Sequence, residues 1–352
     1  MGHGNIDKPI FHITMDSGDS GGREMTKKYG AAILAILLLI GILTVPPVLG
    51  FSEPTKSTAI QKQQKQQKQK KKQKKQQKKH KHHKTAHVVN QTTPGKLVLN
   101  SASVLVEDQQ TGECLVQKKA EAVLPIASIT KLMTAMVVLD ANPSLDESLT
   151  IDQADVDTLR HSRSRLPVGT CLTREEALLV ALMSSENRAA YALARTYPGG
   201  TRAFVAAMNA KARSLGLTRA HFIDPAGLSS GNVSSARDLA QMVAAAHRYP
   251  LIREFTTREK AAIRSGRGMR EFHNTNPLIR SSRWQIGLSK TGFIDEAGRC
   301  LVMQAQVAKR SVLIVLLDAH GKMTRFGDAN RIRQWMEASL PARQTGSVAS
   351  RR

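Results

Sequence analysis

A lysine- and glutamine-rich tract divides the chain and limits which part of it can form a globular domain. Thirteen lysines and no acidic residue lie between Lys56 and Lys84. Such a segment has few apolar side chains to bury, and like charges at helical spacing repel one another. We therefore interpret residues 51–94 as a linker without a core and expect the folded domain to span residues 95–340.

The tract has two possible roles, a solvated spacer or an electrostatic tether to anionic lipid or cell-wall polymer. It also contains four histidines: His80, His82, His83 and His87. The neighbouring lysines disfavour a bound cation, so we expect no metal site there. The tract holds about half of the net charge of +24, so the overall charge does not describe the folded domain.

The segment before the tract has the pattern of an export signal. Lys27 and Lys28 precede an uncharged apolar run, residues 30–45, and two prolines follow it. The run has about 16 residues, whereas a membrane-spanning helix needs about 20 and a signal-peptide core about 7–15. Residues 25–50 are therefore predicted to be a signal peptide cleaved after Gly50, or else a retained anchor.

In the retained form, residues 30–49 would anchor the chain in the inner membrane. The lysines that follow favour cleavage, because positive charge resists export beside a retained anchor. Either form sends the rest of the chain to the periplasm or cell envelope. Export and an aromatic content of 4% argue against a nucleic-acid partner. Residues 1–24 are expected to be a disordered extension, or to precede the true start, and residues 341–352 to be a disordered tail.

Strand patterns stand at both ends of the folded region, and helical patterns fill its middle. The expected strands are Ala102–Val106, Cys114–Val116, Ile286–Phe293, Cys300–Val307 and Val312–Leu317. A turn at Gln110–Glu113 predicts a hairpin between the first two. Helical periodicity runs from Ser128 to about Ala246, polar loops are expected after Pro250, and Arg331–Leu340 predicts a closing helix. The pattern predicts an α+β fold with one antiparallel sheet built from both ends of the domain.

Three cysteines, Cys114, Cys171 and Cys300, are spread along this region. None belongs to a Cys-x-x-Cys pair, so a zinc site of the usual spacing is not expected. A large core does not need disulfide bonds, and we expect the cysteines to be mostly buried and structural. The sequence predicts neither a metal nor a cofactor.

Ser128 and Lys131 form the first candidate pair for chemistry. On a helix these positions share one face, which places an amine beside a hydroxyl. A lysine can remove the proton of a serine only if desolvation or a cationic neighbour lowers its pKa. Taken alone, the pair is more simply explained by a helix with a surface lysine.

Two further motifs follow in the chain. Ser185 and Asn187 end an apolar helical run and could supply a hydroxyl and an amide to one site, although both residue types favour helix ends for local reasons. Lys290, Thr291 and Gly292 lie in an expected strand. There a lysine and a threonine suit a carboxylate, and a glycine permits close approach of a substrate backbone. The simpler explanation is an edge strand protected by a lysine.

The three motifs in this order are typical of penicillin-binding proteins and class A β-lactamases. Four sequence segments resemble those of the low-molecular-mass D-alanyl-D-alanine peptidases, peptidase family S11. They are PIASITKLMTAMVVLDA, ALMSSENRAA, DPAGLS and KTGFIDEAGRCLVM. The sequence looks most similar to their endopeptidase branch, penicillin-binding protein seven. The resemblance covers about residues 95–340 and implies the β-lactamase/DD-peptidase-like fold, peptidoglycan stem peptides and cross-links as substrates, and β-lactams as covalent inhibitors.

The resemblance also implies roles for individual residues. Ser128 resembles the acylated nucleophile and Lys131 its general base, with Ser185 and Asn187 as the second catalytic element. Lys290, with Thr291, Gly292 and Phe293, would bind the substrate, and the backbone N–H groups of Ser128 and Phe293 would form the oxyanion hole. Relatives often have Thr or Ser where this chain has Ile294. A lost hydroxyl beside a docked carboxylate would favour cleavage of an internal cross-link.

Four rival functions remain open at this point. A D-alanyl-D-alanine carboxypeptidase would use the same acyl-enzyme and differ only in the leaving group. An inactive relative could bind peptidoglycan without cleaving it. A class A β-lactamase would need a deacylating glutamate in an E-x-x-L-N loop, and none of Glu254, Glu259 and Glu271 begins that pattern. A nucleic-acid-binding protein is disfavoured for the reasons given above.

Overall fold

The computed structural model describes residues 97–265 and 268–339, which fall inside the predicted domain. The predicted extension, signal segment, linker and tail lie outside these residues. Within the described part, no helix is both long and apolar enough to cross a membrane.

One antiparallel sheet of five strands forms the centre of the domain, in the order β2-β1-β11-β10-β9. Its strands are β1 (Ser101–Asp108), β2 (Cys114–Lys118), β9 (Gln285–Ile294), β10 (Gly298–Val307) and β11 (Arg310–Ala319). The first strand of the domain pairs with the last along almost its whole length, from Ser101 opposite Ala319 to Asp108 opposite Val312. The predicted sheet built from both ends of the domain, and its α+β class, are confirmed.

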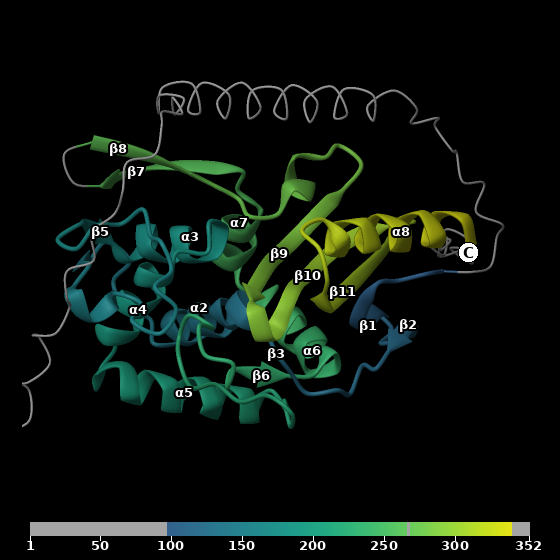
Figure 1. The fold of residues 1–352 in the computed structure, drawn as a ribbon, viewed down its shortest axis with the longest axis horizontal. Coiled ribbons are helices and arrows are strands. Elements are labelled where there is room, and N and C mark those ends of the chain that lie inside the picture. The colour runs from purple at the N-terminus through teal and green to yellow at the C-terminus, as the bar shows by residue number, and fades with distance from the viewer. Residues whose placement is uncertain (1–96, 266–267, 340–352) are drawn as a thin grey trace, which may run out of the picture. The chain divides into compact units, whose positions relative to one another are not determined.

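The sheet is covered on both faces, which explains why its strands are continuous apolar runs. On β11, Val315 packs into the core beneath the helical block, whereas Ile314 and Leu316 pack into a second core. That second core also holds Ile332 and Met336 of α8 (Thr324–Ser339). In Figure 1, α8 lies along one face of the sheet and α6 along the other.

The helical block contains the helices between the two halves of the sheet. They are α2 (Lys131–Asp140), α3 (Arg174–Met183), α4 (Asn187–Arg195), α5 (Gly200–Ser214), α6 (Ala236–Ala246) and α7 (Pro250–Thr257). Two-stranded ladders join its loops: β3 (Leu124–Pro125) with β6 (Val233–Ser234), and β4 (Ser148–Thr150) with β5 (Cys171–Thr173).

Three predictions about this region were wrong or incomplete. After Pro250 the chain forms α7 and then a hairpin, β7 (Lys260–Ser265) with β8 (Gly268–His273), where polar loops were expected. The closing helix begins at Thr324, about two turns earlier than predicted. Of the three cysteines only Cys300 is buried. Cys114 is exposed in β2, at the edge of the five-stranded sheet, and Cys171 is exposed in the short two-stranded ladder of β4 and β5.

A buried aspartate joins the closing helix to the first strand. Asp328 of α8 is fully buried. Its Oδ2 accepts hydrogen bonds from the backbone N–H (2.7 Å) and the hydroxyl (2.6 Å) of Ser101, and its Oδ1 accepts one from the backbone N–H of Asn100 (3.1 Å). Arg331 pairs with the same carboxylate. The Asp328 carboxylate therefore accepts the hydrogen bonds of the N–H groups at the start of β1 and links the first strand of the domain to its last helix.

We predict that Asp328→Ala lowers the free energy of unfolding by about 2–4 kcal/mol, because it leaves buried N–H groups unpaired. Burial alone would raise the pKa of the Asp328 carboxyl, but the hydrogen bonds from Ser101 and Asn100 hold it below its usual value. Its stabilising contribution is thus present above the pKa of the unfolded chain and is lost as the pH falls through the folded-state value. Urea unfolding at pH 7 and pH 3 measures both effects. Asp146→Ala, at an exposed loop residue, is the control, and an equal loss there would contradict the assignment.

Candidate active site

Ser128 lies in a tight turn that two other segments approach closely. It belongs to a 3₁₀ helix, η1 (Ala127–Thr130), that runs directly into α2, and Ala127 has a left-handed backbone (φ +47°). A Cβ at Gly227 would lie 1.9 Å from the carbonyl oxygen of Ala127, and one at Gly292 would lie 3.2 Å from the backbone nitrogen of Ser128. The turn is therefore strained and closely packed, as is common where a reactive group must be held in place.

Lys131 occupies a buried cage of neutral acceptors. Its Nζ donates to Ser128 Oγ (2.9 Å), to Asn187 Oδ1 (2.7 Å) and to the carbonyl oxygen of Ala226 (2.7 Å). The side chain is 1% exposed, and no carboxylate of the described residues forms an ion pair with it. The three acceptors come from η1, the start of α4 and a loop before α6, so the amine is the point where these segments meet.

Burial lowers the pKa of Lys131 from 10.5 to about 7, and the negative charges of Asp224 and Glu186 only partly oppose this shift. A large fraction of the amine is therefore neutral near pH 7. A neutral amine beside a hydroxyl can accept its proton, which is what a serine nucleophile requires.

Lys290 and Ser185 form a second buried pair. Lys290, from β9, donates from Nζ to Ser185 Oγ (2.8 Å) and to the carbonyl oxygen of Thr291 (3.1 Å). Burial, together with the nearby positive charges of Lys131 and Arg325, holds the pKa of Lys290 well below its usual value. Ser185 has a left-handed backbone (φ +63°), so its hydroxyl is presented by a strained turn between α3 and α4.

The predicted site residues therefore gather in one place. Hydrogen bonds connect Ser128, Lys131 and Asn187, and a second bond connects Ser185 with Lys290. A cavity of about 240 Å³ opens beside them. Its lining residues are Ser128, Ser185, Thr275, Thr291, Gly292, Phe293 and Arg325. Thr291 Oγ1 donates to Thr275 Oγ1 (2.7 Å), which fixes one wall.

Sequence reasoning missed Arg325, which reaches this cavity from α8. The residue is 7% exposed, and its Nε and Nη1 have no hydrogen-bond partner among the described residues. Burial and the nearby charge of Arg299 lower the pKa of Arg325 to about 10. Arg325 thus lines a cavity whose lining contains no carboxylate, and the buried amine of Lys290 belongs to the residue next to Thr291 in the same wall. The arrangement suits an anionic ligand such as a carboxylate.

The loop from Asp224 to Ser229 was also missed as a part of the site. The carboxylate of Asp224 accepts hydrogen bonds from four backbone N–H groups, those of Ala226, Gly227, Leu228 and Ser229. This turn aims the Ala226 carbonyl at Lys131. The signal was present as Asp-Pro-Ala-Gly, since an aspartate before a proline and a glycine predicts a turn closed by its own side chain.

Asn187 is positioned by a second loop. Its Nδ2 donates to Ser162 Oγ (2.8 Å), and the backbone N–H of Ser162 donates to Asp157 (2.9 Å). These contacts orient the amide so that its oxygen faces Lys131. No sequence signal singled out Ser162, because its role depends on a contact 25 residues away.

The interpretation of Ile294 was wrong. Its side chain is 5% exposed and packs into the core beneath the helical block. It does not line the cavity, whereas Phe293 does. Side chains alternate along β9, so Thr291 and Phe293 share one face and Ile294 lies on the other. A missing hydroxyl at Ile294 therefore gives no information about the substrate.

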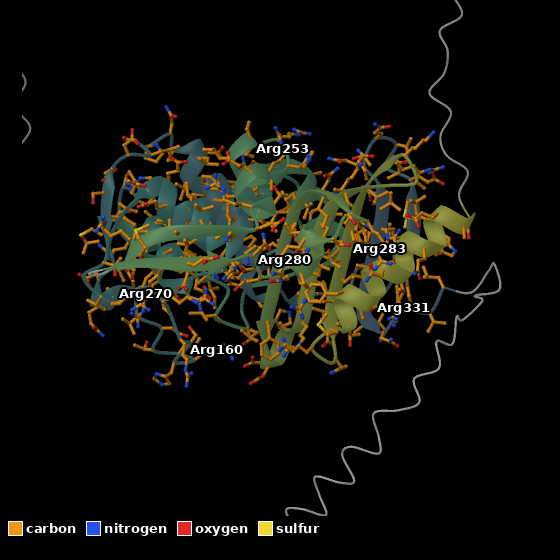
Figure 2. All side chains as sticks on the ribbon, turned by 90° about the horizontal axis from the view of Figure 1, so that it is seen from above. Arg160, Arg253, Arg270, Arg280, Arg283 and Arg331 are labelled. Carbon is orange, nitrogen blue, oxygen red and sulfur yellow. The ribbon has the colours of Figure 1, made fainter. Side chains whose placement is uncertain are left out.

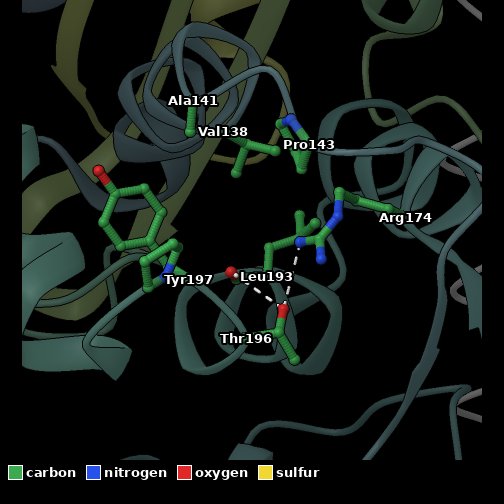
Figure 3. A pocket seen from close by; sticks show the side chains of 8 residues that line it. Val138, Ala141, Pro143, Arg174, Leu193, Thr196 and Tyr197 are labelled. Carbon is green, nitrogen blue, oxygen red and sulfur yellow. Dashed lines mark hydrogen bonds between the residues drawn. The ribbon is translucent and has the colours of Figure 1, made fainter.

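A second cavity, of about 180 Å³, contains none of the predicted residues (Figure 3). Its walls are mostly apolar and come from the ends of α2 and α4, with Arg174 at one side. The guanidinium of Arg174 donates to Thr196 Oγ1 (3.2 Å) and pairs with Glu147. Its charge is thus already balanced, and this cavity offers no nucleophile or base.

Comparison with known proteins agrees with the geometry around Ser128. The family model described as D-alanyl-D-alanine carboxypeptidase, peptidase family S11, matches residues 90–321. The chain belongs to this family. A D-alanyl-D-alanine endopeptidase of Pseudomonas aeruginosa is 51% identical over 241 residues, which cover 68% of this chain and 78% of that protein.

Two further S11-related proteins support the assignment. A D-alanyl-D-alanine endopeptidase of Escherichia coli is 46% identical over 248 residues, covering 70% of this chain and 80% of that protein. The crystal structure of a Streptomyces DD-transpeptidase superposes with a TM-score of 0.63 at 31% identity, covering 68% of this chain and 98% of that one. The predicted β-lactamase/DD-peptidase-like fold is confirmed, and the chain is a serine-type DD-peptidase.

The position of Lys131 predicts the pH dependence of acylation. The amine is the base only when neutral, so the rate of acylation by penicillin should rise about tenfold per pH unit below pH 7 and level off above it. Glu186→Gln removes a charge that raises the pKa of Lys131, so it should move the midpoint to lower pH. Stopped-flow acylation from pH 5 to 9 measures this. Glu175→Gln, at an exposed residue of α3, is the control; an unmoved or higher midpoint for Glu186→Gln would refute the role of Lys131.

Proposed function

We propose that this S11 peptidase is a D-alanyl-D-alanine endopeptidase that cleaves peptidoglycan cross-links through an acyl-enzyme on Ser128. One observation carries the proposal: a buried amine, with a pKa near 7, lies 2.9 Å from the hydroxyl of Ser128, which lines a cavity together with Arg325. The relatives that are 51% and 46% identical are both called endopeptidases.

The residues support a two-step reaction. Ser128 Oγ attacks the carbonyl carbon of a D-alanine residue while Lys131 takes its proton. The tetrahedral intermediate collapses to an ester on Ser128 as the C–N bond breaks, and the amine of the next residue leaves with the proton that Lys131 took from Ser128. Water then attacks the ester while Lys131 accepts its proton. The second tetrahedral intermediate collapses as the bond to Ser128 Oγ breaks, Lys131 returns the proton to that oxygen, and the acyl group departs as a carboxylic acid that ionises. The backbone N–H groups of Ser128 and Phe293 would stabilise the oxyanion in both steps.

Substrate binding in this proposal uses β9 and the cations beside it. Among the described strands β9 lies at the edge of the sheet with β10 as its one paired neighbour, and an extended peptide would bind along its other side. The carboxylate on the leaving residue would bind to Lys290 and Arg325. Its negative charge would stabilise the positive charge of Arg325 and would favour the protonated form of Lys290.

The carboxypeptidase alternative uses the same acyl-enzyme. Its leaving residue is a terminal D-alanine, whereas in a cross-link the leaving residue is a diamino acid that carries its own carboxylate beside the scissile nitrogen. Lys290 and Arg325 fit both carboxylates equally. The choice between the two activities therefore depends on what contacts the side chain of the leaving residue.

Labelling and cleavage together test the proposal. Wild-type protein should be labelled by fluorescent penicillin and should cleave cross-linked dimeric muropeptides faster than it releases D-alanine from monomeric pentapeptides. Ser128→Ala should lose labelling and lower cleavage about a thousandfold or more, with an unchanged thermal midpoint. Labelling that persists in this variant would refute the nucleophile, and a preference for pentapeptides would refute the endopeptidase assignment.

For the segments before the domain, we propose export to the periplasm or cell envelope and a tethering role for the lysine-rich linker. The support is the apolar run behind Lys27 and Lys28 and the concentration of lysines that follows it. Anionic lipid headgroups or wall polymers would bind such a tract with strong salt dependence.

Removing the linker should separate tethering from chemistry. Deletion of residues 52–94 should leave activity on soluble muropeptides within about twofold and weaken retention on envelope fragments at low salt. Replacing the lysines of the tract by glutamine should have the same effect, while replacing them by arginine should not. A large loss of activity on the soluble substrate would show that the tract belongs to the catalytic unit.

A further inference from the structure

Phe293 is an exposed aromatic residue at the mouth of the cavity. Its ring is 49% exposed although the residue lines the same cavity as Ser128 and Arg325. Because Ser128 lines the same cavity, Phe293 belongs to the wall around the place where a bound peptide would be cut. An exposed aromatic ring there contributes little to the core and is available to contact substrate.

Arg299 supports this ring from the neighbouring strand. It pairs with Phe293 in the β9–β10 ladder, and its guanidinium carbon lies 4.2 Å from the ring centroid. The residue is only half-buried, and no carboxylate of the described residues forms an ion pair with it. Its positive charge acts on Arg325. Phe293 and Arg299, which we call the aromatic platform, thus combine an apolar face with an uncompensated charge.

The two leaving residues differ in what would meet this platform. A terminal D-alanine offers only a methyl group beside its carboxylate. A cross-linked diamino acid offers a chain of methylene groups, which leads to the rest of the acceptor stem and its free carboxylates. Methylene groups pack well on an aromatic face, and a carboxylate further along the stem suits a guanidinium that has no acidic partner.

We propose that the aromatic platform is the binding site for the side chain of the leaving residue, and that it selects cross-linked substrates over terminal D-alanine. The inference rests on the proposed endopeptidase function and names the residues that determine its specificity. Because the scissile carbonyl would be bound by backbone N–H groups and the adjacent carboxylate by Lys290 and Arg325, the side chains of the platform change the ratio between the two activities. The chemistry at Ser128 is common to both.

The test compares two substrates on full-length protein. The specificity constant kcat/KM is measured for a purified cross-linked dimer and for a pentapeptide monomer, with wild type, Arg299→Gln and Phe293→Leu. In both variants the ratio of dimer cleavage to D-alanine release should fall about three- to tenfold, the range expected for a partly exposed cation–π or ion-pair contact. The stoichiometry of penicillin labelling checks that each variant is folded.

Two controls isolate the platform. Arg283→Gln removes an exposed arginine beside α8, which Figure 2 labels, and should leave the ratio unchanged. A dimer whose acceptor stem ends in an amide in place of the carboxylate should show a smaller effect of Arg299→Gln, because the charge contact is then absent from both enzymes.

The outcomes separate this inference from the proposed function. If wild-type protein fails to cleave dimers, the endopeptidase assignment falls, whatever the variants do. If wild type cleaves dimers but Arg299→Gln and Phe293→Leu keep its ratio within twofold, the platform does not select the leaving residue and the inference is overturned. An equal effect of Arg299→Gln on the amidated dimer would overturn the charge contact.

Discussion

The burial of one lysine amine is the condition on which this site depends. Lys131 is surrounded by neutral oxygen acceptors from three segments, and desolvation brings its pKa to about 7. Water or a close carboxylate in the same place would restore the charged form and remove the base. The segments that supply the acceptors are therefore constrained by electrostatics as well as by packing. The two carboxylates that act on the amine, Asp224 and Glu186, are themselves engaged: Asp224 binds backbone N–H groups, and Glu186 accepts from Ser164 (2.7 Å).

A second constraint is the unbalanced positive charge around the cavity. Lys290 and Arg325 are buried without an acidic partner among the described residues, and burying an unpaired charge destabilises a fold. A structure selected for stability alone would place an acid there. The contacts that join α8 to the sheet lie elsewhere, at Asp328 and in the second core. Stability lost at the site is the usual counterpart of affinity for a charged ligand.

The sequence predicted the residues of the three motifs better than the residues that surround them in the site. Ser128, Lys131, Ser185, Asn187 and Lys290 were found because three short motifs occur in a characteristic order, and the strands were found because they are long apolar runs. These apolar runs do not indicate on which face of the sheet each side chain lies, because a strand that is buried on both faces shows no alternation of polar and apolar residues. That is why the missing hydroxyl at Ile294 was interpreted as a feature of the substrate site, although its side chain packs into the core. Arg325 was missed because one arginine in a helix has no local signature; only the packing of α8 over the sheet brings it to the cavity.

The arrangement of the sheet explains why residues so distant in sequence meet. Strand β1 pairs with β11 near the middle of the sheet. The segment that follows β2 then crosses to β9, where the turn at Ser128 packs against Gly292. A side chain at Gly292 would press on the backbone of Ile126 and Ser128, and one at Gly227 would press on Ala127. The nucleophile is thus fixed by two glycines that belong to neither its helix nor its motif. The position of Ser128 is therefore set by close backbone contacts between segments that are far apart in the sequence, and the motif residues lie where these segments meet.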